Sequence, residues 1–249
     1  IKTDDIEKLL NEQGEEIALI MLGGVNYYTG QVFDFKKITD LGHKKGIKVG
    51  FDLAHAAGNI KLELHSWKVD FAVWCSYKYL NSGPGSVAGA YIHSRHHHTN
   101  LLRFSGWWGH NKDDRFKMPD KFNPIKSAEG WQLSNPPILS LAAIRASLSI
   151  FDEVGMNALV LKSQKLTDYL IFLLDSIDTN RINVITPKKR GCQISIRVNN
   201  GNKILFDAIT KKGVIADWRE PDVIRVAPVP LYNSFTDVFN FYTILKEEL

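Results

Sequence analysis

The sequence contains few cysteines. Only two occur among its 249 residues, Cys75 and Cys192, and they lie far apart in apolar, strand-like segments. This scarcity disfavours a fold organised by disulfides, and a reducing compartment, the cytoplasm, is the expectation. We expect both thiols to be buried and structural.

The sequence also lacks a long apolar run. The longest runs, residues 17–22 and 169–174, fall well short of the roughly 20 residues that a membrane helix needs, and no signal peptide is visible. We therefore expect no membrane partner. The chain begins at Ile1, without an initiator Met, in what resembles a connector before a helix, so we expect it to be part of a longer polypeptide.

Neither sign of charge dominates. The formal net charge is +4, basic and acidic residues are interspersed, and no basic stripe with interleaved aromatic residues occurs. The sequence therefore predicts no nucleic-acid partner. Residues 96–98 are three histidines, but consecutive side chains cannot all face one ion and no further ligand lies at a zinc-like spacing. We expect solvated surface histidines and no metal.

Short apolar strands alternate with helices in the first part of the chain. Strands are expected at residues 17–22, 48–52, 71–75 and 87–92, and helices at residues 4–10 (capped), 34–45 and after Ala54. This alternation predicts an α/β fold with a mostly parallel sheet, in a large domain of residues 1–139. Ligands of such sheets bind beyond the carboxyl ends of the strands.

The remainder has a different pattern. Residues 94–137 are irregular, aromatic and rich in glycine and proline, which is more typical of a functional loop than of an idle one. Two helices are expected at residues 138–154 and 156–177. The strands at 182–185, 192–198, 214–217 and 223–227, with helices at 202–212 and from residue 235, predict a small α+β domain with an antiparallel sheet over residues 140–249.

One lysine is unusually placed. Lys78 lies among aromatic residues just past the apolar run 69–73, and Gly-Pro-Gly at residues 83–85 marks a shaped turn behind it. A desolvated lysine can act as an imine-forming nucleophile, whereas an ordinary lysine at a strand end extends to water. Both interpretations remain open for the lysine considered alone.

A carboxylate lies at another strand end. Asp52 ends the strand at residues 48–52, and His55 follows three residues later. Alone, Asp52 fits the capping of a helix. Together with Lys78 it would supply the two parts that a pyridoxal phosphate enzyme needs, an imine-forming amine and an acid on the pyridinium nitrogen.

Six segments in order resemble kynureninase, a member of the fold-type-I, class-V aminotransferase-like enzymes. They are Phe-Asp-Leu-Ala-His-Ala-Ala-Gly-Asn at 51–59, Trp-Cys-Ser-Tyr-Lys-Tyr-Leu-Asn at 74–81, Gly-Trp-Trp-Gly-His at 106–110, Arg-Phe-Lys-Met at 115–118, Ser-Asn-Pro-Pro-Ile-Leu at 134–139 and Ile-Arg-Val-Ala-Pro-Val-Pro-Leu-Tyr-Asn-Ser at 224–234. The resemblance implies pyridoxal 5'-phosphate as cofactor and the fold of its large domain, here incomplete.

The resemblance assigns roles position by position. Lys78 forms the imine with the cofactor and is the catalytic base, with Tyr77 as the second catalytic candidate through its bond to the phosphate. Asp52 pairs with the pyridine nitrogen, and His55 lies beside the cofactor. Gly23 stands where relatives often carry a serine, so only its backbone is left for a cofactor contact.

Three further positions concern the substrate. The resemblance implies that Trp107 and Asn135 approach cofactor and substrate from the neighbouring subunit of a homodimer. Arg225 would bind the substrate α-carboxylate, a role that suits its guanidinium. Without the resemblance, Arg225 would be interpreted as a surface ion pair.

The implied reaction is the hydrolysis of L-kynurenine or 3-hydroxy-L-kynurenine to anthranilate or 3-hydroxyanthranilate and L-alanine, in tryptophan catabolism and NAD biosynthesis. A related lyase or desulfurase is the alternative enzyme, but neither cysteine suits a reactive thiol on a mobile loop. A third hypothesis is an incomplete fragment or interaction module that holds no cofactor, because no glycine-rich phosphate cradle precedes Asp52.

Overall fold

The computed structural model describes residues 1–199 and 201–249, and the chain folds into two compact units. Unit 1 comprises Ile1–Gly24, Asp34–Ala54 and Leu62–Leu148, and unit 2 comprises Val25–Phe33, His55–Lys61 and Ser149–Leu249. The domain boundary between residues 139 and 140 stays a prediction.

Unit 1 contains a four-stranded sheet in the order β1-β2-β3-β4. Strands β1 (Leu19–Gly23), β2 (Lys48–Asp52) and β3 (Phe71–Trp74) are parallel, and β4 (Gly89–Ile92) is antiparallel to β3. This confirms the mostly parallel α/β sheet. In register, Gly23 lies beside Asp52 and Asp52 beside Val73, so the carboxyl ends of β1, β2 and β3 share one edge.

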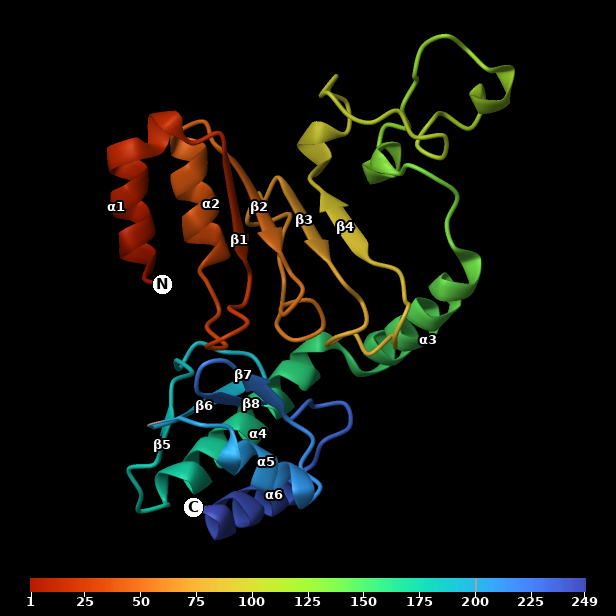
Figure 1. Cartoon of the computed structure of the whole chain (residues 1–249). Helices are drawn as coiled ribbons and strands as arrows, with labels where there is room; N and C mark the ends of the chain where they lie inside the picture. Colours follow the sequence, from red (N-terminus) through yellow and green to blue (C-terminus); the bar gives the residue numbers. More distant parts are fainter. Residues whose placement is uncertain (200) are drawn as a thin grey trace. The chain divides into compact units, whose positions relative to one another are not determined.

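Helices α1 (Thr3–Gln13) and α2 (Phe35–Lys44) lie side by side next to this sheet (Figure 1). Helix α2 begins at Phe35 because the side chain of Asp34 accepts the Lys37 amide at 3.0 Å. A Cβ on Gly42 would lie 2.6 Å from Val49 Cγ2, so the glycine allows α2 to approach β2 closely. Helix α1 starts without the side-chain cap that the sequence had indicated.

Two local expectations are wrong. Residues 54–59 form turns and no helix, because Gly58 adopts a left-handed φ of 78° and ends any helical path. The strand expected at 214–217 instead begins at Asp217. Residues 94–137 carry only the short 3₁₀ helices η2 (Ser94–His96), η3 (Arg115–Lys117) and η4 (Ala128–Trp131), following η1 (Gly14–Glu16) earlier in the chain.

Unit 2 contains an antiparallel sheet in the order β5-β6-β8-β7, as predicted. Helix α3 (Ile138–Val154) leads into α4 (Met156–Asp175) through Gly155, at a φ of 79°. The other elements are β5 (Ile182–Val184), β6 (Ile194–Val198), α5 (Ile204–Lys211), β7 (Asp217–Arg219), β8 (Val223–Val226) and α6 (Phe235–Glu248).

Helices α4, α5 and α6 cover one face of this sheet (Figure 1). Their apolar side chains form a core with those of β6 and β8, among them the fully buried Ile194, Ile196 and Ile224. Alternation along β6 directs Ser195 to the opposite face, where its hydroxyl donates to the carbonyl oxygen of Tyr28 at 2.5 Å. Segment Val25–Phe33 thereby packs on the polar face of the sheet.

A second short segment of unit 2, His55–Lys61, is held by a buried asparagine. Asn59 Oδ1 accepts the Cys192 amide at 2.9 Å, and Asn59 Nδ2 donates to the carbonyl oxygen of His55 at 2.9 Å.

Among the described residues, no helix is both long and apolar enough to cross a membrane.

Candidate functional site

The carboxyl edge of the unit 1 sheet places Asp52 where a ligand would meet it. The side chain is exposed, and its one hydrogen bond among the described residues is the amide of Ala54, which donates to Oδ1 at 2.8 Å. Because no helix follows, Asp52 caps a turn and not the helix that the capping interpretation required. The carboxylate therefore retains acceptor capacity at the edge of the sheet.

Lys78 lies in the loop that follows β3 on the same edge. Its side chain is half-buried, with Nζ 5.9 Å from the centroid of the Tyr77 ring. The Asn81 amide donates to the carbonyl oxygen of Lys78 at 3.0 Å, and Asn81 adopts a left-handed φ of 55°. The buried hydroxyl of Ser76 donates to the carbonyl oxygen of Val87 at 2.6 Å, so both ends of the loop are held.

Tyr77 points its ring toward solvent at this edge. The charge and hydrogen bond of Cys75 raise the pKa of the Tyr77 hydroxyl above its ordinary value. Cys75 itself is only half-buried, which corrects the expectation of a buried thiol: it follows the last residue of β3, where the sheet ends. Cys192 is buried as expected, and burial raises its pKa to about 12.

The end of β1 completes the edge. Gly23 is half-buried beside Asp52 in the parallel pairing, and the amide of Gly24 donates to the Asp52 carbonyl oxygen at 2.8 Å. A Cβ on Gly24 would lie 2.5 Å from Phe35 Cζ and 2.9 Å from Leu53 Cδ2. A glycine is therefore needed immediately after Gly23.

Trp107 and Asn135 lie in the irregular part of unit 1, and both are exposed. The Trp107 ring meets Phe116 edge to face at 5.4 Å. The buried guanidinium of Arg115 supports this region: it donates to the carbonyl oxygen of Trp108 at 2.7 Å and stacks over the Trp108 ring. Sequence reasoning gave Arg115 no role.

Two candidate residues belong to unit 2. His55 is half-buried at the start of its short segment. Arg225 lies on β8 with its side chain 11% exposed; Nη1 donates to the Tyr27 carbonyl oxygen at 2.9 Å and Nη2 donates to Asp217. The ion pair considered for Arg225 is thus present, although the arginine is nearly covered.

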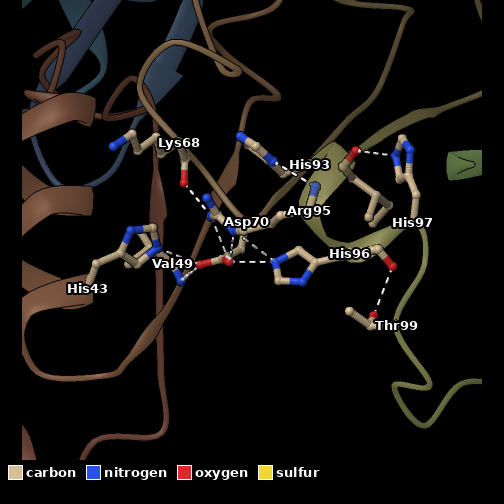
Figure 2. A network of polar contacts seen from close by, with 10 residues as sticks. His43, Val49, Lys68, Asp70, His93, Arg95, His96, His97 and Thr99 are labelled. Carbon is tan, nitrogen blue, oxygen red and sulfur yellow. Dashed lines mark hydrogen bonds and ion pairs between the residues drawn. The ribbon is translucent and has the colours of Figure 1, made fainter.

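The expectation of solvated histidines is wrong for His96. Its side chain is buried, and Nε2 lies 2.6 Å from Oδ1 of Asp70, itself 3% exposed (Figure 2). Arg95 also binds Oδ1, while His43 Nε2 and the Val49 amide each approach Oδ2 at 2.8 Å. The sequence concealed this network because Asp70 stands within an apolar run, far from its partners.

The network fixes the charge of Asp70. Burial alone would raise the pKa of this carboxyl, but the hydrogen bonds from Val49, His43, His96 and Arg95 together outweigh burial and lower it. Asp70 lies at the start of β3, at the opposite end of the strand from the Lys78 loop. Among residues 1–199 and 201–249, no group of three or more histidines, cysteines or carboxylates is arranged to hold a metal.

Solved structures with the same fold define a class. The cysteine desulfurase of Thermococcus onnurineus NA1 superposes with a TM-score of 0.77 at 15% identity, over 99% of this chain and 62% of that one. C-DES with glycine covalently linked to its PLP cofactor superposes with a TM-score of 0.78 at 18% identity, over 96% and 63%. The fold is that of the PLP-dependent, aminotransferase-like enzymes.

Sequence comparison narrows the class. Residues 159–245 match the kynureninase C-terminal domain. The kynureninase of Flavobacterium psychrophilum is 56% identical over 99% of this chain and 60% of its own length, and that of Myxococcus xanthus is 54% identical over 99% and 59%. The chain is therefore similar to kynureninases along almost its whole length, and it spans about three fifths of the length of these relatives.

Proposed function

We propose that this chain carries out its part in the pyridoxal phosphate-dependent hydrolysis of L-kynurenine or 3-hydroxy-L-kynurenine, which yields anthranilate or 3-hydroxyanthranilate and L-alanine. The observation that carries the proposal is the placement of Asp52 and the Lys78 loop at the carboxyl ends of neighbouring parallel strands, in a chain 56% identical to a kynureninase. This reaction would serve tryptophan catabolism and NAD biosynthesis.

The residues of this edge fit the cofactor chemically. The exposed Asp52 carboxylate accepts one hydrogen bond among the described residues, which leaves it able to hold a proton on the pyridine nitrogen. Lys78 supplies a half-buried primary amine to attach the cofactor carbonyl. Tyr77 offers a hydroxyl to the phosphate, the backbone of Gly23 lies beside Asp52, and His55 is proposed to lie beside the ring.

The protein side chains have distinct tasks in this proposal. When bound, the cofactor would supply an electron sink that acidifies the substrate Cα. Lys78 Nζ takes and returns the proton at Cα, and Tyr77 keeps a proton on its hydroxyl. Arg225 binds the α-carboxylate. Trp107 and Asn135 approach the aminophenyl group from the second subunit of a homodimer in the cytoplasm.

A desulfurase is supported less well. The structural neighbours of that name share 15% of residues with this chain, which establishes a common fold only. A desulfurase needs a reactive thiolate, but burial holds the pKa of Cys192 at about 12. Cys75 directly follows the last residue of β3, and its Sγ lies 4.0 Å from the carbonyl oxygen of Ala54. This position at a strand end does not suit a reactive thiol on a mobile loop.

The test is to incubate the protein with pyridoxal phosphate, reduce it with borohydride and map the labelled peptide. We expect a visible absorbance band, a label on Lys78 and loss of both in Lys78→Ala. Lys44→Ala, which removes an exposed lysine of α2, is the matched control and should keep both. Absence of band and label from the wild type would favour the interaction module that holds no cofactor.

A second measurement tests the reaction itself. Anthranilate released from kynurenine is followed by its fluorescence, and Lys78→Ala should lower the rate by at least about a thousandfold, as expected for loss of a covalent catalytic group. A protein that binds the cofactor but gives no anthranilate would contradict the kynureninase assignment and leave the cofactor site standing.

A further inference from the structure

Arg225 and Asp217 form a pair that the architecture of unit 2 imposes. The two residues lie directly opposite each other on the antiparallel strands β8 and β7, so their side chains project from the same face of the sheet. Nη2 of Arg225 donates to Oδ2 of Asp217. On its other side, Nη1 donates to the carbonyl oxygen of Tyr27 at 2.9 Å.

These two acceptors hold the guanidinium without using all of it. An arginine has five N–H donors in a rigid plane, and the contacts with Asp217 and Tyr27 occupy one donor on each terminal nitrogen. Each terminal nitrogen therefore keeps a second N–H. Two parallel N–H groups of this kind match the two oxygens of a carboxylate.

The charged side chains on this face carry a net positive charge that one anion would neutralise. Arg219, two residues after Asp217 on β7, lies with Nη2 3.2 Å from the same Oδ2. Asp217 is therefore shared by two guanidinium groups, and the three side chains sum to one positive charge. The buried Nε of Arg219 has no hydrogen-bond acceptor among the described residues.

The neighbouring charged residues of the sheet, Asp222 and Arg197, neutralise each other. Asp222 lies 3.4 Å from Arg197 Nε and accepts the hydroxyl of Tyr28 at 2.9 Å. Neither Asp222 nor Arg197 therefore competes for the charge of Arg225. The positive charge of this face is concentrated on the Arg219, Asp217 and Arg225 group.

We propose that Asp217 is a positioning residue for the substrate α-carboxylate: it holds the fork of Arg225 in one plane, braced on the other side by the Tyr27 carbonyl, and Arg219 keeps the group positive. The inference rests on the proposed role of Arg225. Asp217 is not a second ligand of the substrate, because two ionised carboxylates repel each other. It acts by removing the rotational freedom that Arg225 would otherwise lose on binding.

The sign of the effect separates positioning from simple electrostatics. Asp217→Asn raises the net charge of the group by one, so attraction alone would tighten the binding of a carboxylate and lower KM. Loss of the brace predicts the reverse, a KM for kynurenine raised about tenfold with kcat changed less than about threefold. Asp217→Glu, which restores the charge, should recover part of the loss.

The matched control breaks an equivalent pair elsewhere in unit 2. Asp168→Asn removes the carboxylate that Arg190 contacts; that arginine is 9% exposed, close to the 11% of Arg225. Its KM and kcat should equal those of the wild type. A second readout is the inhibition constant of the decarboxylated analogue of kynurenine, which lacks the group that Arg225 binds and should be unaffected by Asp217→Asn.

The outcomes distinguish the inference from the function it rests on. If Arg225→Gln raises KM but Asp217→Asn leaves it unchanged or lowers it, the positioning role is wrong and the role of Arg225 stands. If Arg225→Gln leaves KM unchanged, the assignment of Arg225 itself fails. If Asp217→Asn weakens the decarboxylated analogue as much as kynurenine, the effect is structural and the inference is overturned.

Discussion

Replacing Asp70 by Asn should destabilise unit 1 far more than a change of one atom suggests. The Asp70 carboxylate is 3% exposed and joins β3 to α2, β2 and η2 through hydrogen bonds from four residues. Asn preserves the shape but turns one acceptor oxygen into a donor. If that donor faces Val49 and His43, the Val49 amide loses its acceptor at a side chain that is 3% exposed.

The expected cost is about 3 kcal/mol. Breaking a buried charged pair by changing one partner costs about 3–5 kcal/mol, and an unsatisfied buried amide alone accounts for about 1–3 kcal/mol. We take the lower end because one oxygen remains to accept from Arg95 and His96. With about 1.4 kcal/mol per tenfold, this corresponds to a change of about a hundredfold in the local opening equilibrium.

Amide hydrogen exchange measures this locally. The Val49 amide donates to Asp70 Oδ2 at 2.8 Å, so its exchange should accelerate about a hundredfold in Asp70→Asn. Asp40→Asn is the control: it breaks an exposed pair with Lys36 on α2 and should change exchange by less than about threefold, since such pairs contribute below about 0.5 kcal/mol. Acceleration of the Val49 amide by less than about fivefold in Asp70→Asn would refute the reasoning.

The pH dependence follows from the same carboxylate. Although burial opposes ionisation, the hydrogen bonds from Val49, His43, His96 and Arg95 lower the folded pKa of Asp70 below its unfolded value of about 3.9. Its contribution is therefore fully present above about pH 4 and is lost as the pH falls toward the folded pKa. The stability difference between wild type and Asp70→Asn should start to narrow as the pH falls below about 4 and close only toward the lower folded pKa, and a constant difference would contradict this.

Two further predictions concern packing and thiol reactivity. Gly42→Ala should lower the free energy of unfolding by about 1–3 kcal/mol in thermal melts, because its Cβ would lie 2.6 Å from Val49 Cγ2; unchanged stability would show that α2 can move away from β2. At pH 8 an alkylating reagent should label Cys75 and spare Cys192, because Cys192 is buried and its pKa of about 12 keeps it protonated. Mass spectrometry of the labelled native protein measures this, and labelling of Cys192 would contradict the prediction.

Most strands of the two sheets, with β7 as the exception, were predictable because their signals are local. The short apolar run at residues 48–52 and the alternating pattern at residues 192–198 are both local, and the structure places strands β2 and β6 there. The helix expected after Ala54 does not form, and the reason is also local. The alanines at 54, 56 and 57 favour a helix, yet Gly58 in the left-handed region diverts the chain into turns.

The contacts that fix the site were not predictable, because they join residues far apart in sequence. The sequence identified Arg225 and its ion-pair alternative, but only the β7 and β8 register shows that Asp217 is the partner. The same holds for His96, which a local pattern of three histidines assigns to the surface. Its burial depends on Asp70, which is 26 residues away.

Asp52 and Asp70 show how position in a sheet decides what a carboxylate does. Asp52 ends an apolar strand and Asp70 stands within the apolar run 69–73, and no composition rule separates their roles. Asp70 stands at the start of β3, where His43, Val49, Arg95 and His96 use its oxygens, so it serves stability. Asp52 stands at the end of β2, where its side chain is exposed and accepts one hydrogen bond among the described residues. A carboxylate can bind a ligand only if its own fold has not already satisfied it, and of these two only Asp52 meets that condition.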